Sequence, residues 1–228
     1  MSFFSSETIA DGEVVSGGGS GGDNTYFFDD FTGTELEAGW TKATDTGVTL
    51  AVGGDVATFT IVNVNGSATA SRTLYPVDDL PLRVEWFATH NAGSYSKYGI
   101  RLSDASNNLD VLLGKHTSDI QPWIEGSAIS NQYNPTSLGG SQWFALELDT
   151  WFDGSGVRQY LNVWTSNNDV NTRPTKAQWT ARWTNYQLNT NLTGTLDLTI
   201  IGLSYSVVSS VGTLDKLWAW PAFVPEQE

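Results

Sequence analysis

WFALELDTWFDGSGVRQYLNVWT, residues 143–165, is the stretch that decides the fold. It predicts two antiparallel strands joined at Gly154-Ser155-Gly156, because short glycine-rich turns connect the strands of hairpins. Side chains alternate between the two faces of a strand, so one face of this hairpin is expected to be an apolar core face. That inward face carries Phe144, Leu146, Leu148, Phe152, Leu161 and Val163.

The opposite face of the hairpin mixes large rings with charged and amide side chains. Two explanations are open. Tryptophan is largely buried in most proteins, which favours a second layer, such as a loop or a partner, packed over the rings. Tryptophan and tyrosine also combine a flat apolar ring with a polar group, which suits a surface that binds sugars or another protein. This face carries Trp143, Glu147, Asp149, Trp151, Asp153, Arg158, Tyr160, Asn162 and Trp164.

The composition argues against several classes of function. The 228 residues include no cysteine, which excludes disulfides and thiolate metal sites, and only two histidines, which disfavours a histidine-rich metal site. A net charge of −14 argues against nucleic acid, whose phosphates need a basic surface, and against adsorption to anionic membranes. No apolar run approaches the roughly 18 residues of a membrane span. The N-terminus lacks the basic and apolar regions of a secretory signal, so we expect no signal peptide.

Residues 1–24 differ in composition from everything that follows. They contain no Lys or Arg and include a Gly/Ser-rich stretch at residues 17–22, which is typical of a flexible linker. We expect an extended arm that anchors the protein to a partner, followed by one domain over residues 25–228. The apolar side chains predicted to contact the partner are Phe3, Phe4, Ile9, Val14 and Val15.

Short strand signals, bounded by Gly, Asn, Asp and Pro, recur from Tyr26 onward. No segment longer than about ten residues has a helical period, and we expect Val207–Val211 to form a loop. The pattern predicts an all-β fold, a two-sheet antiparallel jelly-roll sandwich. The strands expected outside the central hairpin are residues 26–31, 48–52, 56–62, 68–74, 82–89, 97–102, 109–114, 120–125, 178–186, 196–203 and 214–223.

Two stretches resemble the concanavalin-A-like β-sandwich superfamily, which includes laminin-G-like and legume-lectin-like domains. They are FFDDFTGTELEAGWTKA, residues 27–43, and the central hairpin. The last predicted strand, residues 212–220, also resembles the strand that closes such domains. The resemblance implies a single sandwich over about residues 26–224, and it implies little about function, because this fold hosts lectins, hydrolases and spacers alike.

The resemblance raises a hydrolase hypothesis. Laminarinase-like glycoside hydrolases of this superfamily carry Glu-x-Asp-x-x-Glu or Glu-x-Asp-x-Glu on one strand, with the first and last Glu as nucleophile and acid. Glu147 and Asp149 match the first two positions, but Trp151 and Phe152 stand where the second Glu belongs. Glycoside hydrolysis needs two placed carboxyl groups. We therefore expect a protein that is not an enzyme, and hydrolysis is the third hypothesis.

A lectin hypothesis follows from the same residues. Legume-type lectins bind manganese and calcium through a run that Glu147, Asp149 and Asp153 match only in part. Calcium needs six to eight oxygen ligands, so we expect no cofactor, with a calcium site as the alternative. Sugar binding without a metal is favoured instead. The predicted glycan contacts are the rings of Trp143, Trp151, Tyr160 and Trp164 and the polar groups of Asp149, Arg158 and Asn162.

The whole profile resembles accessory proteins of bacteriophage particles, such as capsid decoration or fibre proteins. That resemblance implies a non-enzymatic structural protein that is assembled in the host cytoplasm and attached to other virion proteins by residues 1–24. It would be displayed on the virion surface in many copies or as a homo-oligomer, with a lectin-like sandwich facing glycans. The alternative is a free carbohydrate-binding protein.

Overall fold

The computed structural model describes residues 27–76, 81–92, 95–115, 119–152, 154 and 156–221, and these residues form an antiparallel β-structure. The predicted arm contacts in residues 1–24 lie outside the described residues. No helix in the described part of the chain is long and apolar enough to cross a membrane. The elements are β1 (Phe27–Asp29), β2 (Thr41–Thr44), β3 (Val48–Val52), β4 (Ala57–Pro76), β5 (Leu82–Ala92), β6 (Ser96–Ser103), β7 (Asn108–Lys115), β8 (Ile120–Glu125), β9 (Gln132–Tyr133), β10 (Ser141–Phe152), β11 (Val157–Ser166), the 3-10 helix η2 (Lys176–Gln178), β12 (Thr180–Gln187) and β13 (Thr195–Pro221).

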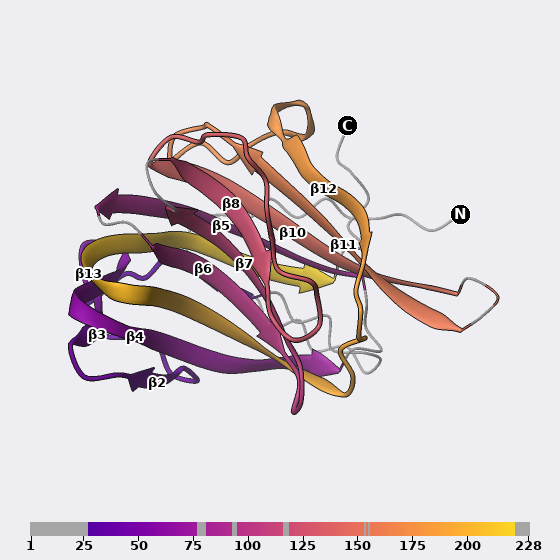
Figure 1. Ribbon diagram of the computed structural model, residues 1–228, viewed down its shortest axis with the longest axis horizontal. Helices are drawn as coiled ribbons and strands as arrows, with labels where there is room; N and C mark the ends of the chain where they lie inside the picture. The colour runs from indigo at the N-terminus through magenta and orange to yellow at the C-terminus, as the bar shows by residue number, and fades with distance from the viewer. Residues whose placement is uncertain are drawn as a thin grey trace, which may run out of the picture.

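Two long strands, β4 and β13, run through both layers of the fold (Figure 1). They pair with each other from Thr195↔Pro76 to Leu214↔Ala57. On its other side, β13 pairs first with β6 and then, further along, with β5. One layer therefore has the order β9-β8-β7-β6-β13-β4-β2, and the other has the order β12-β11-β10-β5-β13-β4-β3. The expected two-sheet antiparallel sandwich is confirmed, as a continuous sheet that curls over on itself.

The bend in the shared strands corrects three sequence predictions. The residues expected to form a loop, Val207–Val211, lie inside β13, and each expected pair of strands, 56–62 with 68–74 and 196–203 with 214–223, is a single strand. The pairing of β13 with β4 shifts register on both sides of Val208. Such β-bulges bend a strand without ending it.

The core lies between the two layers. Trp86 of β5 and Phe144 of β10 are fully buried, and their rings stack with centroids 5.2 Å apart. The predicted inward face of the hairpin is confirmed for five of its six residues, which are all buried: Phe144, Leu146, Leu148, Leu161 and Val163. Phe152 is the exception and is 75% exposed, because the pairing of β10 with β5 stops at Leu148↔Leu82.

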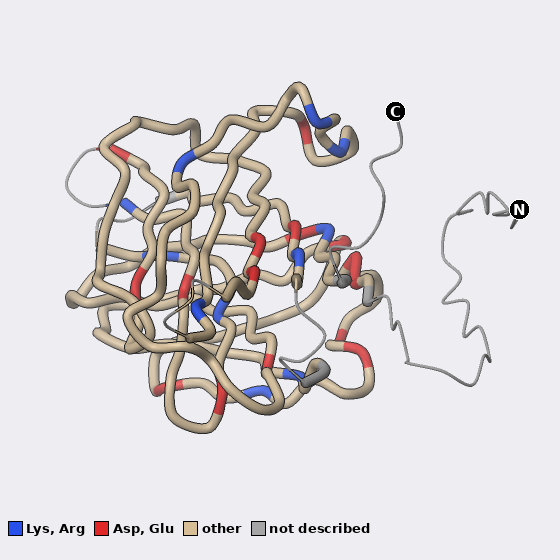
Figure 2. The backbone as a smooth tube through the Cα atoms, turned by 90° about the vertical axis from the view of Figure 1, so that its right-hand side faces the viewer, with Lys and Arg blue, Asp and Glu red and all other residues tan. Residues whose placement is uncertain are grey.

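Basic residues are scattered over the described backbone rather than gathered in one place (Figure 2). Several of them are paired with acids on other strands of the same layer, as Arg101 of β6 is with Asp110 of β7 and Lys97 of β6 with Glu125 of β8. Binding along nucleic acid phosphates needs basic residues gathered in a patch or stripe, and the backbone positions of Lys and Arg in this part of the chain are not gathered in that way (Figure 2).

Candidate functional site

Most of the predicted glycan contacts lie on the outer face of β10 and β11. The hairpin formed by these strands extends beyond its neighbours, since β11 pairs with β12 only as far as Tyr160↔Gln187 (Figure 1). Four of the predicted residues lie together near the end of this hairpin, and we call them the hairpin surface: Asp149, Trp151, Arg158 and Tyr160. Across the two strands, Asp149 faces Tyr160 and Trp151 faces Arg158.

The hairpin surface is organised around the ring of Trp151, which is 56% exposed. Its Nε1 donates a hydrogen bond of 2.6 Å to Oδ2 of Asp149, and Oδ1 of Asp149 accepts one from the backbone N–H of Thr150. The ring of Tyr160 stands edge-on to Trp151 at 6.1 Å between centroids. The carboxylate therefore fixes the orientation of an indole ring that stays open to solvent.

Trp143 does not belong to this exposed surface, which corrects its predicted place. Its side chain is fully buried, and its Nε1 donates to the backbone carbonyl of Asp169 at 2.8 Å. The rings of Phe87 and Trp218 pack against it at 5.6 and 5.5 Å. This end of the hairpin thus has the second packing layer that the sequence left open, and no ring face of Trp143 remains for a glycan.

The two remaining predicted contacts, Asn162 and Trp164, are half-buried, between the fully buried Trp143 and the exposed Trp151. Trp164 is half-buried, and the guanidinium of Arg83 lies 5.3 Å from its ring centroid. Asn162 accepts a hydrogen bond of 2.7 Å from the backbone N–H of Asn185 through Oδ1. Both residues continue the outer face of β11 away from Tyr160 toward the body of the sheet.

A chain of ion pairs crosses the same face beside Glu147. Nη1 of Arg83 lies 3.4 Å from Oε2 of Glu147, and Nε of Arg83 donates to Oε1 of Glu85 at 2.8 Å. The other oxygen of Glu85 accepts from Nε of Arg173 at 2.7 Å. Glu85 is only 2% exposed and both of its oxygens are occupied, so this carboxyl group is not placed to protonate a sugar beside Glu147.

Two of the three carboxylates considered for calcium have other partners in the structure, and the third is not described. Glu147 binds Arg83 and Asp149 binds Trp151, while Asp153 lies outside the described residues. Within the described ranges, no group of three or more metal-ligating side chains is close enough to hold an ion.

The structure also assembles a cluster that the sequence analysis did not single out, on the outer face of β6, β8 and β9. Four side chains contact one another in a row, which we call the tyrosine row: Tyr133, Trp123, Lys97 and Tyr205. The Trp123 and Tyr133 centroids are 4.9 Å apart, and Nζ of Lys97 lies 3.9 Å from the Trp123 centroid and 4.7 Å from that of Tyr205. Both Lys97 and Tyr205 donate hydrogen bonds to Glu125.

Burial in the tyrosine row is uneven. Lys97 and Glu125 are 6% and 4% exposed, whereas the rings of Tyr133 and Tyr205 are 54% and 57% exposed. Burial and the neighbouring Glu125 carboxylate raise the pKa of Tyr205, so its hydroxyl remains a protonated donor. Gly114 makes room below the row, since a Cβ there would lie 2.8 Å from Cδ1 of Trp123.

The alternation of Trp123 and Glu125 on β8 was a signal of this cluster, because it matches the pattern of the hairpin. Lys97 and Tyr205 carried no comparable signal. They reach Glu125 from sequence positions 28 and 80 residues away, through the tertiary fold alone.

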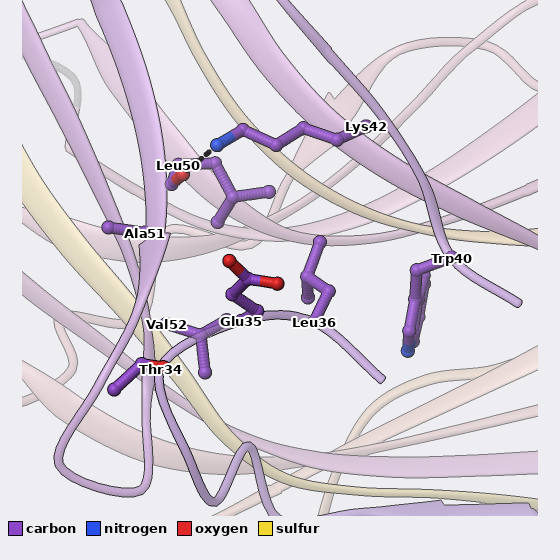
Figure 3. A pocket seen from close by; sticks show the side chains of 8 residues that line it. All are labelled: Thr34, Glu35, Leu36, Trp40, Lys42, Leu50, Ala51 and Val52. Atoms are coloured by element: carbon purple, nitrogen blue, oxygen red, sulfur yellow. Dashed lines mark hydrogen bonds between the residues drawn. The ribbon is translucent and has the colours of Figure 1, made fainter. Parts of the chain in front are cut away.

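A cavity of about 450 Å³ opens between the edge strands β2 and β3 (Figure 3). Its wall combines apolar and charged side chains, with the ring of Trp40 at one end and the carboxylate of Glu35 pointing inward. Lys42 of β2 donates to the backbone carbonyl of Leu50 on β3 and so ties the two edges together. The cavity has the volume of a small-molecule site.

No family model and no curated protein matches the sequence. Solved structures do match the fold. A GH43 glycoside hydrolase engineered to display endo-xylanase and exo-arabinofuranosidase activity has a TM-score of 0.61 at 11% identity, over 89% of this chain and 42% of that one. The CBM2 module of the evolved Dit of Lactobacillus casei BL23 phage J-1 has a TM-score of 0.51 at 11% identity, over 85% and 94%. The lectin UEA-II, complexed with galactose, has a TM-score of 0.54 at 8% identity, over 87% and 99%.

These similarities show that the chain has a β-sandwich fold that lectins and glycoside hydrolases also adopt. They also correct the expectation that the protein is not an enzyme, because glycoside hydrolases are among the proteins that share this fold. The chain spans 42% of the GH43 enzyme it matches, so that enzyme contains much that has no counterpart here.

Proposed function

We propose that the protein recognises carbohydrate through the hairpin surface. The observation that carries this proposal is the ring of Trp151, which is large, more than half exposed and held in place by Asp149. The apolar face of a sugar ring packs on such an indole. Arg158 and the hydroxyl of Tyr160 lie beside it and supply hydrogen-bonding groups for sugar hydroxyls. Asn162 and Trp164 extend the same surface along β11.

The similarity to a lectin, a CBM2 module and a glycoside hydrolase supports this proposal at the level of the fold. It does not identify the sugar. Proteins that share the fold suggest which sugars to test: xylan from the GH43 enzyme, galactose from UEA-II, and β-1,3-glucan from a β-1,3-glucanase of Mycobacterium marinum with 10% identity.

The test compares Trp151→Ala with Phe152→Ala. Both replace an exposed ring on the same hairpin, but only Trp151 lies on the proposed surface. We expect Trp151→Ala to weaken binding to laminarihexaose, xylohexaose or galactose by about tenfold or more, equivalent to roughly 1.4 kcal/mol. Phe152→Ala should leave the Kd unchanged. Equal binding by the Trp151→Ala variant and the parent protein would refute the proposed surface.

The same samples should be assayed for release of reducing sugars from β-1,3-glucan and xylan, because hydrolases share this fold. Turnover that is lost in Glu147→Gln and kept in Glu35→Gln would assign hydrolysis to the face that carries Glu147.

We further propose that the protein is a component of a virus particle, attached to other virion proteins by residues 1–24 and displayed on the particle surface in many copies. Support comes from the apolar side chains of the arm, such as Phe3, Phe4 and Ile9, and from the phage Dit module that shares the fold. A segment that orders on binding recovers its entropy cost by burying apolar side chains such as Phe3 and Phe4. Many copies would strengthen weak glycan contacts through avidity.

Co-sedimentation with purified particles tests the arm. We expect removal of residues 1–24 to abolish attachment and Phe3→Ala/Phe4→Ala to reduce it strongly. Ser5→Ala/Ser6→Ala, at adjacent positions, is the matched control and should attach normally. Full attachment of the shortened protein would rule out anchoring by the arm.

A further inference from the structure

The tyrosine row and the hairpin surface lie on the two opposite outer faces of the sandwich. The row stands on β6, β8 and β9 and reaches Tyr205 of β13, whereas the hairpin surface stands on β10 and β11. The inner faces of both layers pack into one core between them. A ligand at one surface therefore touches none of the residues of the other.

Stability alone does not account for the row. A buried ion pair is often no more stabilising than apolar residues of similar size, because both charges lose their water. Here Lys97 and Glu125 are almost fully buried on the outer side of a sheet, beneath rings that are themselves exposed. The ion pair instead fixes the positions of the neighbouring aromatic rings. Lys97 contacts the rings of Trp123 and Tyr205, and Glu125 holds the hydroxyl of Tyr205.

The two ends of the row are the parts that face solvent. Trp123 covers one side of Tyr133, and Lys97 covers one side of Tyr205. More than half of the surface of each tyrosine is nevertheless exposed, so both residues remain accessible to a ligand. Rings that are fixed in advance bind with a smaller loss of side-chain entropy.

The charges around the row select the class of ligand. Lys97 is paired with Glu125, and the neighbouring Arg101 binds Asp110 through Nε and Nη2 at 2.7 and 2.8 Å. The surface is therefore close to neutral, on a chain whose net charge is −14. Acidic glycans and nucleic acids, which also stack on aromatic rings, would be repelled by the chain as a whole. Uncharged sugars would not.

We propose that the tyrosine row is a second carbohydrate-binding surface, which takes neutral oligosaccharides by stacking their sugar rings on Tyr133 and Tyr205. It has the same class of ligand as the proposed function but shares no residue with the hairpin surface. Either surface can exist without the other. With both, one chain would bind two glycans on opposite sides and could link them.

Calorimetric titration with laminarihexaose and xylohexaose tests the second surface. The decisive variant is Tyr133→Ala/Tyr205→Ala, and its matched control is Tyr133→Phe, which keeps both rings and the hydrogen bond from Tyr205 to Glu125. Both tyrosines are exposed, and a thermal melt of each variant checks that the fold is kept. We expect two oligosaccharides per chain for the parent and the phenylalanine control. We expect one for the alanine variant, one for Trp151→Ala, and none when all three alanines are combined.

The outcomes separate the two proposals. Binding that persists in Trp151→Ala and disappears in the double alanine variant supports the second surface even if the hairpin surface fails. Unchanged stoichiometry and Kd in the double alanine variant overturns the second surface and leaves the hairpin surface standing. A parent protein that binds neither oligosaccharide overturns the second surface as stated.

Discussion

Asp215 is a buried carboxyl group in the bulged part of β13. Unlike the buried Glu85 and Glu125, it has no close hydrogen-bonded cation among the described residues to compensate its negative charge. Burial raises its pKa from 3.8 to about 6, and Lys216, whose Nζ lies 3.9 Å from Oδ1, offsets this only in part. The negative charges of Asp55 and Asp30 also raise the pKa of Asp215. The folded protein therefore holds a proton on Asp215 that the unfolded chain releases at lower pH.

This predicts how stability depends on pH. Because the folded pKa lies above the unfolded one, the stabilisation by Asp215 is complete below about pH 3.8 and is lost as the pH rises through about 6. We expect Asp215→Asn to remove this loss and to raise the free energy of unfolding at pH 7.5 by about 2–3 kcal/mol. Urea titrations at pH 4, 5, 6 and 7.5 measure it.

Glu35→Gln, at an exposed position, is the control for the change in net charge. An Asp215→Asn variant with the same pH dependence as the parent protein would show that the carboxyl group is not strained by burial.

The hairpin of β10 and β11 shows how one strand can be both core and surface. Leu146 and Phe152 have the same phase on β10, yet Leu146 is 1% exposed and Phe152 is 75% exposed. The difference arises because β5 supports only the first part of β10. Phase alone does not decide burial when a strand extends beyond its neighbours.

We therefore expect Leu146→Ala to lower the free energy of unfolding by about 2–5 kcal/mol, as buried leucine truncations do. Phe152→Ala should change it by no more than about 0.5 kcal/mol, as at other surface positions. Chemical denaturation monitored by circular dichroism measures both. Similar losses in the two variants would mean that the hairpin end is covered in the folded protein.

The elements that the sequence predicted well are those with local signals. Alternation and the glycine turn located the hairpin, and β6, β7 and β8 lie within one residue of the expected ranges 97–102, 109–114 and 120–125. The continuity of β4 and β13 was missed because a bulge contains the same small and polar residues as a turn. Whether a strand bends or reverses is decided by its partners.

The residues of the candidate surfaces also divide into those with a local signal in the sequence and those placed by distant residues. The position of Trp151 on the outer face was readable from alternation. The burial of Trp143 was not, because the residues that cover it, such as Asp169 and Trp218, are distant in sequence. The tyrosine row was missed for the same reason, since four separate elements bring its members together.

At the scale of the whole molecule, the shared strands tie the two layers into one unit. Neither layer contains its full set of strands without β4 and β13. These two strands pair with each other, and β13 also pairs with β5 and β6, while β4 pairs with β2 and β3. Loss of one layer would also expose the inner face of the other, because both contribute to a common core.

The described domain should accordingly unfold in a single transition. We expect urea curves followed by tryptophan fluorescence and by far-ultraviolet circular dichroism to coincide, with equal midpoints and slopes. The two signals sample different parts of the fold, since fluorescence reports mainly on buried rings such as Trp86 and circular dichroism on all strands. Separate midpoints would show that the layers unfold independently.

The length of β13 has a mechanical consequence. A load applied along this strand would shear the hydrogen bonds on both of its sides, to β4 on one and to β5 or β6 on the other, because these bonds run across the strand direction. Such bonds must break together under shear rather than one after another as in unzipping. The protein would therefore resist stretching along β13 far better than peeling of its edge strand β12.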